Sequence, residues 1–362
     1  MLLDNQIDIS KELMDFIKES PTAFHVVKNF STMLEKAGFI KLNERNKWKI
    51  EQGGKYYVTR NDSSIIAFQV PDNMDFYNFQ IAAAHSDSPA FKIKENPEMV
   101  EDNNYVTLNV EKYGGMLMAP WFDRPLSVAG RVIVREDSGL KPVLVNVDRD
   151  LCVIPNLAIH MNRDVNNGIK YNPQKDMIPL FGEIASKDKF EKIIAMEAGT
   201  DADSIVSADL FLYNREVGKI WGADNEFMSA PRLDDVMCAF SCIKALTDNK
   251  ENSKSVNVCA IFDNEEVGST TKQGADSSFL YDVLSRISMC MGKDSEDFIR
   301  ACASSFMLSA DNAHAVHPNY KEKADPTNRP YMNKGIVIKY NANQKYTTDA
   351  ISASIFKEIY KK

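Results

Sequence analysis

The sequence predicts an α/β protein in which a mostly parallel sheet is covered by helices on both faces and carries a large inserted β-rich domain. After residue 221, apolar strand-like and helix-like segments alternate, which is typical of a parallel sheet. Between about residues 94 and 221, short β-rich segments alternate instead with Gly, Pro and Asn turns. We therefore expect residues 1–93 and 222–362 to form one domain in two parts, with residues 94–221 inserted as a separate domain.

The individual elements follow from local patterns. A helix is predicted from Ser20 as N-cap and Pro21 as its first residue to Gly38. Strand-like runs follow at "KYYVTR", "SIIAFQV" and "FQIAAAHSDSP", and in the middle part at "YVTLNV", "GRVIVRE" and "KPVLVNV". The last part is predicted to contain helix 231–247, strand 255–262, helix 276–291, strands 305–310 and 335–340, and helix 347–361.

Composition narrows the classes of function. The chain has 362 residues, of which 44% are apolar, and a formal net charge of −8. That charge offers no basic face for nucleic acid or an anionic membrane. The sequence predicts no signal peptide and no apolar segment of about 18 residues that could span a membrane. Cys238 and Cys242 are expected to be buried thiols one helical turn apart, which fits a reducing cytoplasm. Small molecules or peptides remain as partners.

Charged clusters directly follow apolar strands. The stretch "VNVCAIFDNEEVGSTT" ends an apolar run in Asp263, Glu265 and Glu266, although charge is costly to desolvate. Polar residues stand in the same position after other strands or at a helix start, namely His85, Asp87, Asp234, Asp235 and Asp311. Ligands of open α/β sheets bind beyond the carboxyl ends of the strands. We therefore expect one histidine and several carboxylates to meet in one crevice.

This mixture of imidazole and carboxylate suits Zn²⁺, whose N and O ligands lie at roughly 2.0–2.2 Å. Two ions about 3.5–4 Å apart and bridged by a carboxylate are plausible. Successive side chains of an extended segment diverge, so one of Glu265 and Glu266 can bind metal while the other acts as general base. Single acids have plainer explanations: Asp276 is expected to cap a helix, and His25 to be a packing residue.

Several long motifs resemble one family. They are "AAAHSDSPAFKIK", "SAPRLDDVMCAF", "FDNEEVGS", "SADNAHAVHPNY", "WFDRPLSVAGRVIV" and "IPNLAIHMNR". Together they resemble the aspartyl aminopeptidases, a family of co-catalytic dizinc metallopeptidases, from about residue 10 to the end of the chain. The resemblance implies that His85 and Asp311 bind one zinc, that Glu266 binds the other, and that Asp234 bridges them. It also implies that Glu265 is the general base.

The resemblance implies further roles outside the metal ligands. Asp87 would orient the His85 ring. His160 resembles a histidine that reaches the site of a neighbouring subunit, and Lys339 resembles a lysine that pairs with the acidic side chain of the substrate. The implied activity is removal of an N-terminal Asp or Glu residue from peptides by a zinc-activated water. Family members assemble as homo-oligomeric dodecamers, so this chain is expected to do so in the cytoplasm.

The chain departs from the family pattern after "TTDAISASIFKEIYKK". Family members continue into a Gly-Thr-rich loop and a last histidine, which binds the same zinc as Glu266. His314 and His317 are expected to be structural and do not replace it. The second zinc site should then be weakened and peptidase activity reduced. The missing histidine leaves open an impaired or silent member that acts only through assembly. A dizinc aminopeptidase that prefers neutral or hydrophobic residues is a separate alternative.

Overall fold

The computed structural model describes residues 4–73, 77–249 and 254–361. The chain divides into two compact units, Met1–Ala310 and Asp311–Lys362. The first unit contains two large sheets and a small two-stranded one. We describe each unit by itself.

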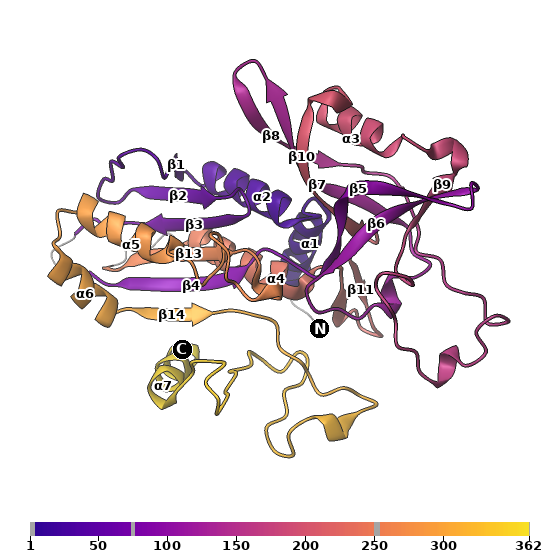
Figure 1. Cartoon of the computed structure of the whole chain (residues 1–362). Helices are drawn as coiled ribbons and strands as arrows, with labels where there is room; N and C mark the ends of the chain where they lie inside the picture. Colours follow the sequence, from indigo (N-terminus) through magenta and orange to yellow (C-terminus); the bar gives the residue numbers. More distant parts are fainter. Residues whose placement is uncertain (1–3, 74–76, 250–253, 362) are drawn as a thin grey trace. The chain divides into compact units, whose positions relative to one another are not determined.

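The first sheet of this unit is mixed and has helices on both faces (Figure 1). Its strands are, in spatial order, β1 (Ile40–Leu42), β2 (Lys55–Arg60), β3 (Ser64–Gln69), β13 (Val256–Phe262), β4 (Phe79–His85) and β14 (Phe306–Ser309). β1 is parallel to β2, and both β13 and β14 are parallel to β4. β3 is antiparallel to β2 and β13, because a short turn joins β2 to β3 as a hairpin. The predicted α/β class is confirmed, with β3 as an antiparallel member.

The two faces of this sheet explain why its central strands are apolar throughout. Cys259 and Ile261 of β13 pack with α1 (Asp4–Lys18), α2 (Ala23–Lys36) and α4 (Leu233–Asp248). Val258 and Ala260 alternate with them and pack with α5 (Phe279–Cys290) and α6 (Ser295–Ala303). Successive side chains of a strand point to opposite faces, so both must be apolar when helices cover both.

Some predicted boundaries differ from the structure. Helix α2 begins at Ala23 with Thr22 as N-cap, so Ser20 and Pro21 lie before it. Helix α5 has Ser278 as its N-cap, so the prediction that Asp276 caps a helix is wrong. Helices α1 and α6 were not predicted, although both carry the one-sided hydrophobic pattern that is typical of a surface helix.

The second sheet is antiparallel throughout. In spatial order it contains β8 (Gly139–Asn146), β7 (Leu126–Glu136), β10 (Ile205–Asn214), β5 (Ala90–Glu101), β6 (Tyr105–Tyr113) and β9 (Leu180–Glu183). Helix α3 (Phe190–Ala198) packs on it through Phe190 and Ile194. A hairpin of β11 (Lys219–Trp221) and β12 (Phe227–Ser229) follows. The assignment of 94–221 as an inserted domain stays a prediction.

The second unit differs from the prediction in one element. Residues 335–340 were expected to be a strand, but this prediction is wrong, since within residues 311–361 the structure records no strand with which they could pair. A strand without a partner leaves its backbone polar groups unsatisfied by a ladder. The expected C-terminal helix is present as α7 (Ala350–Tyr360), which Asp349 caps by accepting a hydrogen bond from the Ser352 amide at 2.8 Å.

Candidate metal site

His85 lies at the carboxyl end of β4, which stands between β13 and β14 in the first sheet. Its register partner in the parallel strand β13 is Phe262, the last residue of that strand. Segments 86–88 and 263–266 therefore leave the sheet at the same edge. The Ser86 amide donates to the Phe262 carbonyl at 2.7 Å, which ties the two exits together.

The His85 ring is buried among carboxylates. Its Nε2 atom lies 3.5 Å from Asp234 Oδ1, 4.0 Å from Asp235 Oδ2 and 3.9 Å from Glu265 Oε2. On the opposite edge of the ring, Nδ1 lies 3.1 Å from the Asp87 carbonyl oxygen and 3.3 Å from Asp87 Oδ1. A proton on Nδ1 would leave Nε2 as an electron-pair donor that faces the other acids.

Asp87 supports the segment that carries the two glutamates. Its carboxylate is 4% exposed. Oδ1 accepts a hydrogen bond from the Glu265 amide at 3.2 Å, and Oδ2 accepts one from the Glu266 amide at 3.2 Å. Oδ2 also accepts a bond from the Tyr113 hydroxyl at 2.6 Å. The buried carboxylate therefore fixes the backbone of both glutamates as well as the His85 ring.

The two glutamates differ in exposure, while the different roles predicted for them stay predictions. They open a short 3-10 turn, Glu265–Val267, after Asn264 in the left-handed conformation. The Glu265 side chain is 53% exposed, although its backbone is held by Asp87. Glu266 is half-buried, and burial together with the charge of Asp234 raises its pKa to about 7. Both carboxylates lie near His85, but that of Glu265 is the more exposed of the two.

Asp234 and Asp235 stand in the first turn of α4, where the backbone departs from helical angles. A cis peptide bond joins them. Asp235 is completely buried, and its Oδ2 accepts a hydrogen bond from the His85 amide at 3.3 Å. Asp234 is 58% exposed at its side chain, and its carbonyl accepts a bond from the Ser88 hydroxyl at 2.6 Å. The pair therefore divides into a buried supporting carboxylate and an open one.

These groups fit a divalent cation. His85, Asp234 and Asp235 each offer an atom within 4.8 Å of the others, and so do His85, Glu265 and Glu266. Although burial lowers the pKa of His85, its contacts with Asp234 and Asp87 raise that pKa to about 11. This shift reports a concentration of negative charge that a cation would balance. The imidazole and carboxylate donors are those that zinc takes in proteins.

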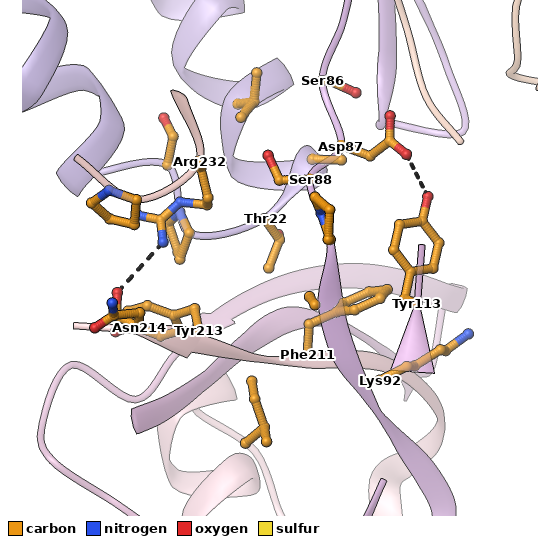
Figure 2. A pocket seen from close by; sticks show the side chains of 18 of the residues that line it. Thr22, Ser86, Asp87, Ser88, Lys92, Tyr113, Phe211, Tyr213, Asn214 and Arg232 are labelled. Atoms are coloured by element: carbon orange, nitrogen blue, oxygen red, sulfur yellow. Dashed lines mark hydrogen bonds between the residues drawn. The ribbon is translucent and has the colours of Figure 1, made fainter. Parts of the chain in front are cut away.

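A cavity of about 480 Å³ adjoins the site. Asp87, Ser88 and Asp234 line it from the side of the first sheet, and Tyr113 and Phe211 line it from the second sheet. Figure 2 shows Asp87 and Tyr113 joined by their hydrogen bond at one side of this cavity. The carboxylate network therefore lies next to a hollow between the two sheets of the first unit.

Two predicted residues belong to the second unit. Asp311 is its first residue and directly follows Ala310, whose amide donates to the Ala83 carbonyl of β4 at 2.7 Å. Within the second unit, Lys339 Nζ donates to Asp311 Oδ2 at 2.6 Å and to the Asn312 carbonyl at 2.7 Å. His317 accepts a hydrogen bond from the Asn319 amide at 3.1 Å through Nδ1, which fits a structural role. The predicted metal and substrate roles of Asp311 and Lys339 stay predictions.

His160 lies exposed in the segment between Ile154 and the short turn Val165–Asn167. Among the described residues, no hydrogen bond or ion pair joins it to the acid cluster of its own chain. The prediction that it serves a neighbouring subunit stays a prediction.

Sequence reasoning missed part of this network. Asp235 was noticed beside Asp234 but was given no role of its own, while Tyr113 and Asn264 were overlooked. The Asn264 side chain donates to the Tyr113 hydroxyl at 2.9 Å. The signal for Tyr113 was the "KYGG" segment just after the predicted strand "YVTLNV", where a glycine pair permits close approach of the backbone.

The sheet with helices on both faces and the histidine-carboxylate cluster at its strand ends fit the class of metal-dependent hydrolases. The model of the aminopeptidase I zinc metalloprotease family, M18, matches residues 16–362. The chain belongs to this family, and it is a zinc aminopeptidase, a hydrolase that acts on peptides.

Individual relatives agree with this assignment. A probable M18 family aminopeptidase 2 from Clostridium acetobutylicum is 52% identical over 99% of this chain and 84% of its own length. Among solved structures, the complex of Ape4 and Nbr1 matches with a TM-score of 0.93 and 38% identity, over 97% of this chain and 72% of that one. The mApe1 dodecamer of S. cerevisiae matches with a TM-score of 0.85 and 28% identity, over 99% and 83%.

Proposed function

We propose that this aminopeptidase removes N-terminal Asp or Glu residues from peptides, with Glu265 as its general base. One observation supports this role above all: the backbone of Glu265 is tied to a buried carboxylate, while its side chain stays half-exposed 3.9 Å from His85 Nε2. A general base must be held in place and yet be open to substrate. Glu266, the neighbouring alternative, is more buried and faces Asp234.

The residues proposed to hold two zinc ions are His85 and Asp311 for one, Glu266 for the other, and Asp234 as the bridge. Zinc supplies Lewis-acid chemistry, which polarises a carbonyl group and makes water more acidic. Asp87 contacts His85 Nδ1 and so favours presentation of Nε2 to a metal.

Glu265 would move the proton. Its carboxylate would accept a proton from the attacking water and deliver it to the amine of the departing peptide. The buried carboxylate of Asp87 would keep the Glu265 backbone fixed during both transfers, since it accepts its hydrogen bond from the Glu265 amide and not from the reacting carboxylate.

Lys339 is the proposed determinant of substrate preference. Its ammonium group already pairs with a carboxylate, that of Asp311, at 2.6 Å within the second unit. An acidic substrate side chain presents the same chemistry. Replacement by Met should therefore lower kcat/KM for Asp- and Glu-capped chromogenic amides by about 10- to 100-fold. Leu-capped amides should change by less than about twofold, in steady-state assays of each substrate.

The matched control is Lys345→Met, which removes an exposed lysine of the same unit. An equal loss with acidic and neutral substrates would instead assign Lys339 to the support of Asp311. A wild-type enzyme that cleaves Leu-capped amides faster than acidic ones would favour the alternative preference for neutral residues.

We further propose assembly as a homo-oligomer, in which His160 acts in the site of a neighbouring copy. The S. cerevisiae neighbour is described as a dodecamer, and His160 stands exposed in a loop of this chain.

Free cysteines support a cytoplasmic location. In the described part of the chain, no helix combines the length and apolar character needed to cross a membrane.

A further inference from the structure

Tyr113 connects the second sheet to the hydrogen-bond network of the metal site. It is the last residue of β6, a strand of the second sheet. Its hydroxyl donates to Asp87 Oδ2 at 2.6 Å and accepts from the Asn264 side chain at 2.9 Å. Figure 2 shows the tyrosine ring reaching from the strand toward the Asp87 carboxylate. One hydroxyl thus links segment 85–88 with segment 263–266.

The partner of that hydroxyl controls several groups at once. The Asp87 carboxylate accepts bonds from the Glu265 and Glu266 amides and contacts His85 Nδ1. A rotation of this carboxylate would therefore shift the proposed base and two proposed zinc ligands together. Hydrogen bonds to an ionised carboxylate are about twice as strong as neutral ones, so the tyrosine contact is an effective restraint on that rotation.

Two further contacts fix the position of the hydroxyl. The Tyr113 ring packs edge-on against Phe211 of β10, with 5.7 Å between the ring centroids. Gly114 has a φ of +74°, and a Cβ atom at this residue would lie 2.9 Å from the Glu266 Cβ. The backbone at Gly114 therefore lies so close to Glu266 that a larger residue at position 114 would clash with it.

We propose that Tyr113 is a positioning residue for the peptidase reaction, which acts through Asp87 to set His85, Glu265 and Glu266. A residue of the second sheet thereby stabilises the positions of site residues that follow strands of the first sheet. The expected loss of peptidase activity rests on the proposed function. The expected loosening of residues 263–268 does not, and it can be measured without zinc or substrate.

The test variant is Tyr113→Phe, which removes the hydroxyl and keeps the ring against Phe211. Its matched control is Tyr105→Phe at the opposite end of the same strand, where the side chain is exposed. In the metal-free full chain, amide hydrogen exchange of peptides that cover residues 263–268 should become about tenfold faster in Tyr113→Phe. It should not change in the control.

With zinc, the same variant should show a functional loss. Zinc affinity, measured by competition with a chelator, or kcat for an Asp-capped amide should fall about 10- to 100-fold. KM should change by less than about twofold, because Tyr113 acts through a supporting residue and not through the substrate. Water from the adjoining cavity can partly replace the lost hydroxyl, so the loss should not be complete.

A double-mutant cycle tests the route through Asp87. In an Asp87→Asn background, the further change Tyr113→Phe should alter zinc affinity by less than about twofold. A full additional loss in that background would show that the tyrosine acts elsewhere and would overturn the inference. Unchanged hydrogen exchange at residues 263–268 in the single variant would also overturn it. Faster exchange in a chain without peptidase activity would leave Tyr113 as a positioning residue and reject the proposed function instead.

Discussion

Replacing Glu265 with Gln should lower kcat for an Asp-capped amide about a thousandfold, within the range that a general base contributes. Gln keeps the size of the side chain but cannot accept a proton from water. Zinc content should not change, because Glu265 is the proposed base and Glu266 the proposed ligand. The measurement is steady-state hydrolysis together with metal analysis of the same preparation.

The control is Glu197→Gln in α3, an exposed glutamate of the second sheet's helix. It should retain the wild-type kcat. Loss of zinc from Glu265→Gln would contradict the proposal that Glu266 is the zinc ligand and Glu265 only the general base. A kcat within about threefold of wild type would reject Glu265 as the base, and Glu266 would then be the candidate, since its pKa is raised to about 7.

The location of the site could be predicted because two of the segments that form it follow neighbouring parallel strands. β4 and β13 are parallel and end in register, so residues that follow them must meet. Charged residues after buried strands were therefore informative: His85, Asp87, Glu265 and Glu266 come together as expected. The antiparallel β3 does not disturb this logic, because it contributes none of these side chains.

The parts that sequence reasoning missed depend on contacts between distant elements. Tyr113 joins the site because β6 of the second sheet ends beside Asp87. The alternation of apolar and polar residues along β6 does not predict this contact. Asp234 and Asp235 are adjacent, and only the non-helical start of α4 decides which is buried. The failed strand at 335–340 has the same cause, since a strand exists only through its partner.

The second large effect is expected at Asp234. Replacing it with Asn should lower zinc affinity by at least about 100-fold and abolish detectable hydrolysis. Mutation of residues that hydrogen-bond metal ligands typically lowers metal affinity or activity about 10- to 100-fold. Loss of a proposed bridging ligand should therefore lower zinc affinity further. Zinc affinity can be measured by chelator competition, and the zinc-dependent rise in Tm should disappear with it.

Folding of the metal-free chain should survive this change. The Asp234 side chain is 58% exposed, and its charge contributes to the raised pKa of Glu266. Removing this charge relieves repulsion with Glu266 but also removes a contact that raises the pKa of His85, so the two effects oppose each other and the metal-free Tm should change little. Asp276→Asn, which alters an exposed acid near α5, is the matched control and should keep zinc affinity and activity. An Asp234→Asn chain that still binds zinc as tightly as wild type would remove Asp234 from the proposed ligand set, and with it the bridge between the two ions.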